Sequence, residues 1–243
     1  FFPGYYFQMN LPVCHSSYTI RVPTHVRLYY WLKNWAAGNS IRRNESSQEP
    51  LLRQNCLRDG REYTCYTWEK RLMPPIVREP QMPPWYEVAP AVHASLFKEW
   101  KYLNELTGSM QKERMQLTPE IEDLAFRLTE KCETEHEKTA ALYHWVQKNI
   151  RYISVKSSLS SGWSGHPAPE TLEQGYGDCT DKAVLFATLL RAVDIEAEPV
   201  VVRTNDRGRF DPEYPVLACN HCITEVHLPD GILFLDCTSQ NHR

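Results

Sequence analysis

The sequence lacks long apolar runs, blocks of one charge and any recognisable motif for a redox cofactor or a bound phosphate. No stretch approaches the ~20 consecutive apolar residues that a membrane span needs, so we expect no transmembrane segment. Lysine and arginine total 27 against 30 for aspartate and glutamate, which gives a net charge of -3. Because the two signs are mixed along the chain, nucleic acid is disfavoured as a partner.

The chain also lacks an initiator methionine, and no basic region precedes its opening aromatic residues, "FFPGYYFQMN". A secretory signal peptide would show a basic region before its apolar stretch. We therefore interpret the sequence as a fragment or a mature form, from which a signal peptide could have been removed.

The eight cysteines show none of the repeated pairs that are typical of a zinc site or a secreted disulfide framework. Their spacing therefore leaves the compartment open. The nearest candidate bridge joins Cys56 and Cys65 in "CLRDGREYTC", where Asp59-Gly60 predicts a hairpin turn. A two-residue turn would place Cys56 opposite Tyr63 and leave Cys65 only diagonal to it, so the sequence disfavours this bridge.

The length and composition indicate a folded protein with two domains. The chain has 243 residues, of which 42% are hydrophobic and 23% charged, as in ordinary globular proteins. Alternating apolar residues predict strands in "SYTIRVP", "VRLYYWL" and "REYTCYTWEKRL". Prolines between residues 72 and 90 then predict an extended connector. We expect a β-rich first domain over residues 1–105, truncated at its start.

A second domain is predicted after a linker at 106–117, in which the segment 109–117 is polar and aperiodic and follows a helix expected to end at Gly108. Thr118-Pro119 is typical of a helix start, and two amphipathic helices follow. A helix over 179–193 is apolar on nearly every side and should be buried. The last strands are "EAEPVVVRT", "NHCITEVHL" and "GILFLDC". This order predicts an α+β core over residues 118–243.

The stretch "GYGDCTDKAVLFATLLRA" places Cys179 at the start of the buried helix. Most free cysteines are small buried hydrophobes, and this is the structural interpretation. A helix N-terminus, however, stabilises a thiolate, and its N–H groups can hold an oxyanion. Gly175 and Gly177 would allow a substrate carbonyl to approach closely. On this stretch alone, the structural and catalytic interpretations weigh about equally.

A nucleophilic thiol needs a base, and the base needs a group that orients it. His221 opens one late strand, and Asp236 closes the next. A loop from His227 to Asp230 would place His221 directly opposite Asp236. A two-residue Asp230-Gly231 turn would instead place Asp236 opposite Glu225, ~13 Å from His221 at ~3.3 Å per residue. Triad chemistry requires the first register.

Each of these residues also has a structural interpretation. His221 could be a polar residue satisfied on a half-exposed strand, and Asp236 a turn carboxylate before Thr238. Either interpretation alone is more probable than catalysis, but the order Cys, His, Asp after a buried helix favours a triad. A lone carboxylate amid "LFL" is costly, and a histidine would relieve that cost. Asp178 and Asp181 are expected to be helix-end carboxylates.

"YGDCTDKAVLFATLLRAVDIEAEPVVVRT" and "NHCITEVHLPDGILFLDCTS" resemble the transglutaminase-like superfamily, whose core is papain-like. The family pattern maps onto Gly177, Cys179, His221 and Asp236. "IRY" at 150–152 and "HPAPETLEQGYGDC" look like the lead-in of bacterial members, which carry an N-terminal β domain. The resemblance implies an α+β fold in which a papain-like core follows a sandwich-like β-rich domain.

The resemblance also implies a reaction. Cys179 would attack an amide carbonyl, His221 would relay the proton and Asp236 would fix the imidazole. We expect a periplasmic or exported cysteine protease or amidase that acts on a peptide or protein through an acyl-enzyme, without a cofactor, although calcium stays open. Trp163 is a candidate second oxyanion donor, and Gly177 a candidate cleft residue. Cys222 and Cys237 depart from the family pattern, but neither should remove the triad.

Three alternatives stay open. The acyl-enzyme could pass to an amine, which would make the protein a protein-glutamine amine transferase that crosslinks its substrates. The chain could also be a non-catalytic binding or scaffold module with the same fold. Finally, Cys219 and Cys222 flank His221 at a zinc-like spacing, although a strand would point the two thiols to opposite faces.

Overall fold

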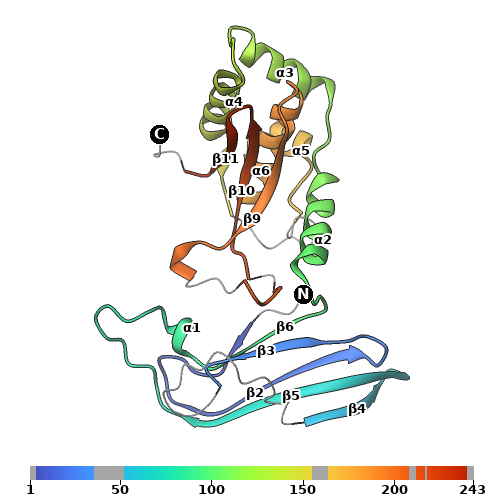
Figure 1. Cartoon of the computed structure of the whole chain (residues 1–243), viewed down its shortest axis with the longest axis vertical. Coiled ribbons are helices and arrows are strands. Elements are labelled where there is room, and N and C mark those ends of the chain that lie inside the picture. The colour runs from blue at the N-terminus through green and yellow to red at the C-terminus, as the bar shows by residue number, and fades with distance from the viewer. Residues whose placement is uncertain (1–3, 36–51, 155–163, 208–211, 217, 240–243) are drawn as a thin grey trace. The chain divides into compact units, whose positions relative to one another are not determined.

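The computed structural model of the chain (Figure 1) describes residues 4–35, 52–154, 164–207, 212–216 and 218–239. The chain divides into two compact units. The first comprises Phe1–Leu103 and Arg203–Ala218, and the second Asn104–Val202 and Cys219–Arg243. No helix among the described residues is long and apolar enough to cross a membrane.

The first unit contains two antiparallel three-stranded sheets, with strand orders β1-β6-β3 and β2-β5-β4. Their strands are β1 (Tyr5–Tyr6), β2 (Val13–Pro23), β3 (Tyr29–Lys33), β4 (Leu52–Arg58), β5 (Arg61–Met73) and β6 (Ala91–Ser95). Side chains from both sheets form one core that includes Ile20, Tyr66, Trp68 and Val92. Two sheets that share a core in this way form a sandwich-like arrangement.

The disulfide that the sequence disfavoured is present in this unit. The strands β4 and β5 pair as expected from a two-residue turn, with Cys56 opposite Tyr63. Cys56 and Cys65 are nevertheless bonded, with their Cα atoms 6.4 Å apart. The prediction was wrong because a diagonal cross-strand pair still lies within the Cα separation that a disulfide spans.

The junction between the units is more helical than predicted. The proline-rich connector contains a short helix, α1 (Trp85–Val88), and the next helix, α2 (Trp100–Lys112), does not end at Gly108. A glycine inside a helix costs only about 0.5–1 kcal/mol relative to alanine, so it does not by itself stop one. Most of the predicted linker is therefore helix. Residues 203–218, which we had assigned to the second domain, cluster with the first unit.

The second unit is built around one buried helix, α6 (Cys179–Arg191), whose residues from Cys179 to Leu190 are all buried. It contacts β9 and β10 of the antiparallel sheet β11-β10-β9, and it also contacts α3, α4 and α5. The bounds are α3 (Pro119–Thr129), α4 (Glu135–Asn149), α5 (Ala168–Gln174), β9 (Ala197–Val202), β10 (His221–Leu228) and β11 (Gly231–Leu235). The predicted α+β fold class is confirmed.

Two very short strands precede α6. β7 (Arg151–Tyr152) and β8 (Tyr176–Gly177) pair in parallel, with Tyr152 opposite Gly177. Because β8 ends two residues before Cys179, this pairing brings the backbone of Tyr152 close to the start of α6. A three-residue 3-10 helix, η1 (Asn205–Arg207), follows β9 and belongs to the first unit.

Candidate active site

The start of α6 is fixed by a reciprocal pair of carboxylates. The Asp178 side chain accepts hydrogen bonds from the N–H groups of Thr180 (2.8 Å) and Asp181 (3.2 Å). The Asp181 side chain accepts one from the N–H of Asp178 (2.8 Å). This capping box makes Cys179 the first residue of the helix, and it confirms the predicted helix-end role of both aspartates.

The same capping box limits which main-chain groups could bind an oxyanion. Asp178 takes the N–H groups of Thr180 and Asp181 with its side chain, and its carbonyl accepts from the N–H of Lys182 (3.1 Å). These three N–H groups already have acceptors. The N–H of Cys179 is therefore the first-turn group that remains a candidate for binding an oxyanion.

Gly177 and Gly175 have structural reasons of their own. A Cβ atom on Gly177 would lie 2.5 Å from the Cβ of Asp181, so a side chain there would displace the capping carboxylate. Gly175 ends α5 in the left-handed region with φ of 69°, where glycine is favoured. Neither glycine needs a substrate to explain it, and a cleft role for Gly177 stays a prediction.

His166 is a residue that sequence reasoning missed. Its N–H donates to Asp181 Oδ1 (2.7 Å), and its Nδ1 lies 3.0 Å from the same oxygen. Asp181 thus joins the loop before α5 to the first turn of α6. No periodic pattern announced this contact, because the two residues are 15 positions apart in irregular backbone and a helix end.

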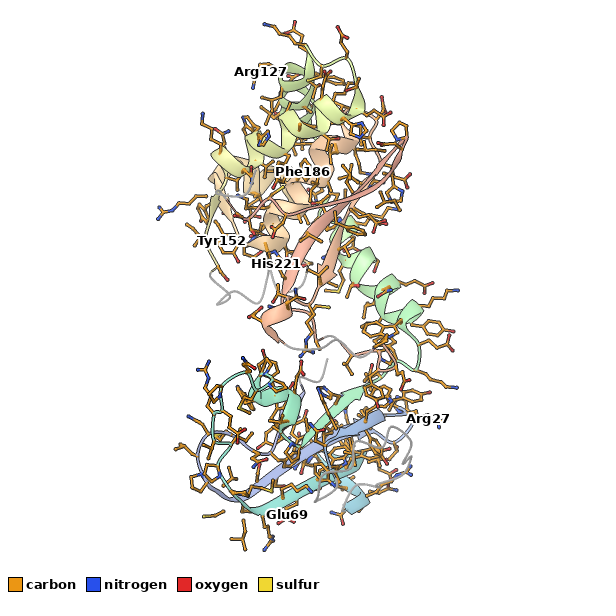
Figure 2. The ribbon with its side chains drawn as sticks, turned by 60° about the vertical axis from the view of Figure 1, so that its left-hand side comes forward. Arg27, Glu69, Arg127, Tyr152, Phe186 and His221 are labelled. Atoms are coloured by element: carbon orange, nitrogen blue, oxygen red, sulfur yellow. A yellow bond between two sulfur atoms is a disulfide. The ribbon has the colours of Figure 1, made fainter. Side chains whose placement is uncertain are left out.

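His221 and Asp236 meet through a register that differs from both alternatives considered above. The β10–β11 pairs run from Thr224–Leu235 to Leu228–Gly231, so the turn is Pro229-Asp230. Continued by one step, this register would set Asp236 opposite Ile223, diagonal to His221 on the same face. His221 Nε2 and Asp236 Oδ2 are 2.8 Å apart, and Figure 2 shows His221 at the end of its strand.

The His221 ring also reaches Cys179. Hydrogen bonds with Asp236 and with Cys179 raise the pKa of His221 to about 10, against the lowering effect of burial. Because Asp236 binds Nε2, Nδ1 is the ring nitrogen left for the thiol. Cys179 itself is 5% exposed. The structure therefore brings the three predicted residues together, while their catalytic roles stay a prediction.

Asp236 is held as a carboxylate. Burial raises the pKa of Asp236, but hydrogen bonds from His221 and Thr238 outweigh this effect and lower the pKa to about 2. Its Oδ1 accepts from the N–H (2.9 Å) and the hydroxyl (2.6 Å) of Thr238. Since Oδ2 is then left to His221, a negative charge faces the ring and favours the imidazolium form.

Two further thiols nearby are buried and protonated. Burial raises the pKa of Cys222 and of Cys237 well above the ordinary value. Cys222 lies on the opposite face of β10 from His221, and Gln111 Nε2 donates to its sulfur at 3.7 Å. Cys237 packs in the main core. Neither residue displaces the triad.

Trp163, the predicted second oxyanion donor, lies outside the described residues. Tyr152 is a different aromatic residue at this site, and its side chain is 41% exposed. Burial raises the pKa of Tyr152, with smaller contributions from Cys179 and Asp178. Its hydroxyl is thus within electrostatic range of the thiol. The sequence contributed only the motif "IRY" at this position, without a role for the tyrosine.

Cys219 and Cys222, the pair at a zinc-like spacing, have separate hydrogen-bond partners. Cys219 is partly buried and its thiol donates to the carbonyl of Val201 (3.7 Å). Within the described ranges, the group with metal-ligand atoms close together is Glu198, Glu225 and His227, whose atoms lie within 4.8 Å of one another. The Glu225–His227 hydrogen bond of 2.8 Å already satisfies part of this group.

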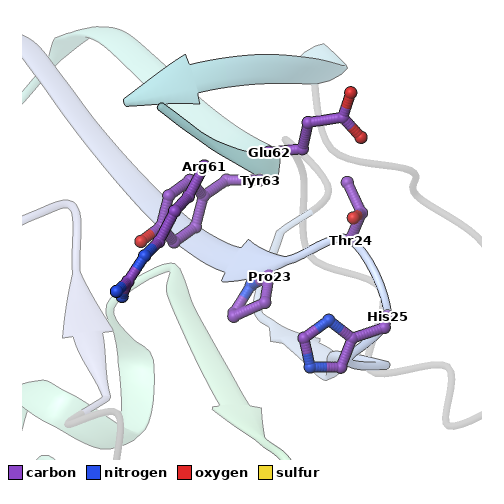
Figure 3. Close-up of a pocket in the computed structure, with 6 residues that line it drawn as sticks. All are labelled: Pro23, Thr24, His25, Arg61, Glu62 and Tyr63. Atoms are coloured by element: carbon purple, nitrogen blue, oxygen red, sulfur yellow. The ribbon is translucent and has the colours of Figure 1, made fainter. Parts of the chain in front are cut away.

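A hollow of about 450 Å³ lies in the first unit (Figure 3). It is lined by Pro23, Thr24, His25, Arg61, Glu62 and Tyr63. These residues come from the end of β2, the turn after it and the start of β5. They contain no nucleophile paired with a base, so we place the candidate chemistry at Cys179.

Comparison with known families decides the identity of the second unit. Residues 122–236 match the model of the transglutaminase-like superfamily. This part of the chain belongs to the transglutaminase-like superfamily. The matched span contains Cys179, His221 and Asp236, and it runs from within α3 to just beyond β11. The family resemblance inferred from the sequence is confirmed.

Solved structures share the fold. A crystal structure of a "putative protease" from Parabacteroides distasonis superposes with a TM-score of 0.72 at 20% identity, covering 96% of this chain and 42% of that chain. The chain therefore spans less than half of that protein. At this identity the likeness shows the fold alone.

More distant structures include a "Putative Cysteine Protease" from Cytophaga hutchinsonii, with a TM-score of 0.42, 16% identity and coverage of 97% of this chain and 80% of that one. The periplasmic domain of TgpA from Pseudomonas aeruginosa superposes with a TM-score of 0.40 at 14% identity, covering 99% of this chain and 94% of that one. These scores are too low to support an argument. A comparison with curated proteins found no match.

Proposed function

We propose that the protein is a transglutaminase-like cysteine enzyme that hydrolyses a peptide or another amide through an acyl-enzyme. One observation carries this proposal: the His221 ring lies 2.8 Å from the Asp236 carboxylate, and a side-chain interaction with Cys179 contributes to the raised pKa of the same ring. A thiol at a helix N-terminus, a base within reach and an orienting carboxylate are the three parts that nucleophilic acyl transfer needs.

In this mechanism His221 takes the proton of Cys179, and Asp236 stabilises the resulting imidazolium. The thiolate attacks the amide carbon, and the carbonyl oxygen gains the negative charge beside the N–H of Cys179. When the C–N bond breaks, the imidazolium gives its proton to the leaving amine and a thioester remains. Water then attacks the thioester with His221 as the base, which releases the acid and restores the thiol.

The charge state of the ring supports this sequence of steps. The pKa of His221 is raised to about 10, so the imidazolium persists at neutral pH. A charged ring beside the sulfur favours the thiolate by charge attraction. For the thiols of Cys222 and Cys237, burial outweighs the neighbouring groups that lower the pKa, and their pKa values are raised instead.

The substrate and compartment are part of the same proposal. We infer a peptide or protein substrate and no required cofactor. We also infer an exported or periplasmic location, which is supported by the Cys56–Cys65 disulfide, because such bonds persist mainly in oxidising compartments. Non-reducing peptide mapping of protein from its native compartment should find this pair bonded. If both thiols were free there, the proposed location would lose its support.

Hydrolysis by the purified chain tests the reaction. With a mixed peptide library as substrate and mass spectrometry as readout, Cys179→Ala should lower the rate by about 10³-fold or more. Cys132→Ser is the matched control, because Cys132 is a free thiol on the same unit outside the candidate site. If Cys179→Ala cleaved as fast as the wild type, the proposed nucleophile would be wrong.

Alkylation separates the enzyme from a scaffold module. We expect iodoacetamide at mildly acidic pH to label Cys179 faster than the exposed thiol of Cys14 in the same molecule, because the charged ring of His221 lies beside Cys179. Equal or slower labelling would favour the scaffold. Addition of a glutamine peptide and a labelled primary amine then distinguishes transfer from hydrolysis, and dominant amine incorporation would favour the crosslinking alternative.

A further inference from the structure

We propose that Tyr143 and Gln147 of α4 are positioning residues that hold Asp236 in place behind His221. The inference rests on the proposed function, because it concerns the orienting member of the triad. We call these two side chains the α4 brace. They lie four positions apart on one face of the helix, so both side chains can contact the same neighbouring segment.

A brace is needed because Asp236 lies beyond the end of its strand. The pairing of β10 with β11 ends at Thr224–Leu235, one residue before Asp236. The ladder that fixes His221 against Val202 of β9 therefore does not extend to the aspartate. With His221 diagonal to Asp236, a small shift of the segment after β11 would lengthen the 2.8 Å contact between the two side chains.

The brace supplies main-chain hydrogen bonds where the ladder stops. The Tyr143 hydroxyl donates to the carbonyl of Asp236 (2.8 Å), and Gln147 Nε2 donates to the carbonyl of Ser239 (2.5 Å). Gln147 Nε2 also lies 3.1 Å from the Tyr143 hydroxyl, and its Oε1 lies 3.3 Å from His144 Nδ1. The segment from Asp236 to Ser239 is thus held at both ends by one helix.

Because Gln147 is buried, the loss of its hydrogen bonds would cost free energy. The Gln147 residue is only 7% exposed, and a buried amide that loses its partners is strongly disfavoured. Within the segment, Thr238 fixes Oδ1 of Asp236 with two hydrogen bonds and leaves Oδ2 to His221. The turn therefore orients the carboxylate, while the α4 brace fixes the backbone that carries it.

Two conservative variants test the brace in the full chain. Tyr143→Phe keeps the ring, which packs edge-on against Phe186 with centroids 5.9 Å apart, and removes only the hydroxyl. Gln147→Met keeps the length of the side chain and removes its donor. Thr129→Val is the matched control, because it deletes a buried hydrogen bond to Ala125 (2.8 Å) in α3, outside the triad.

The readout is the rate of Cys179 alkylation by iodoacetamide as a function of pH. Loosening Asp236 should destabilise the imidazolium, so alkylation of Cys179 should become about tenfold slower at a given pH. Asp236→Asn should slow alkylation at least as much, whereas Thr129→Val should leave it unchanged.

Titration of His221 by NMR tests directly whether the α4 brace affects the imidazole. The brace predicts a lower His221 pKa in Tyr143→Phe and in Gln147→Met than in the wild type. If both variants fold and their profiles and His221 titrations match those of the wild type, the brace is overturned. If wild-type Cys179 proves no more reactive than Cys14, the proposed function fails, and the NMR titration alone then decides whether the brace acts on His221.

Discussion

At the scale of single residues, the site depends on two ionised groups that stabilise each other. His221 has its pKa raised from 6.5 to about 10, and Asp236 has its pKa lowered from 3.8 to about 2. The raised pKa stabilises the fold fully below pH 6.5, and this contribution is lost as the pH rises through about 10. The lowered pKa stabilises the fold above pH 3.8, and its contribution is lost as the pH falls through about 2.

Asp236→Asn should therefore destabilise the second unit most between about pH 3.8 and 6.5. The difference between wild type and variant should shrink above pH 10 and below pH 2, where one of the charges is absent in the folded state too. Hydrogen exchange of α6 at several pH values would measure this difference in stability between the wild type and Asp236→Asn. A difference that did not vary with pH would mean that the contact is not an ion pair.

The sequence singled out Cys179, His221 and Asp236 as candidate triad residues, but it did not predict their geometry. Cys179 could be placed because a buried helix and its start leave a local signal. His221 and Asp236 depend on the register of a hairpin, and "LPDG" is compatible with several turns. Tyr143, Gln147 and His166 act through contacts between distant segments, for which a single sequence carries no local pattern.

At the scale of elements, glycines give the clearest contrast between local and tertiary constraints. Gly108 lies inside α2, and a Cβ atom there would meet nothing within 4 Å. Gly177 lies in β8, where a Cβ atom would meet Asp181 at 2.5 Å. The sequence suggested a stop for the first and a substrate contact for the second, because neither the continuing helix nor the neighbouring carboxylate is visible in the local sequence.

Gly177→Ala should destabilise the second unit by about 1–3 kcal/mol, because the added methyl group overpacks the capping carboxylate. Alkylation of Cys179 should slow as the start of α6 is displaced. Gly108→Ala is the control and should stabilise α2 by about 0.5–1 kcal/mol. Chemical denaturation followed by circular dichroism would measure both, and a neutral Gly177→Ala would contradict the packing argument.

At the scale of the whole molecule, the two units are stabilised differently. The first has a disulfide between neighbouring strands, and the second has a continuous core around α6. Replacing Cys56 and Cys65 by alanine should destabilise the first unit by about 2–3 kcal/mol, because the unfolded chain regains the conformational entropy that the closed loop had removed.

The same double variant should leave the alkylation of Cys179 unchanged, because the bond belongs to the other unit. Thermal unfolding of the wild type with and without a reductant, read by mass-resolved hydrogen exchange, would separate the two effects. Cys14→Ala, which removes an exposed free thiol of the same unit, is the control. Equal destabilisation by Cys14→Ala would show that the bridge itself contributes little.

The division of the chain has a practical consequence for protein engineering. The polypeptide leaves the transglutaminase-like unit after Val202 and returns at Cys219, so a truncated gene starting at Asn104 would still encode sixteen residues of the other body. Yet Val202 and His221 are antiparallel partners, and a tight hairpin can join such strands with a few residues. Substituting a short designed turn for residues 203–218 would thus yield a compact, single-unit version of this protein.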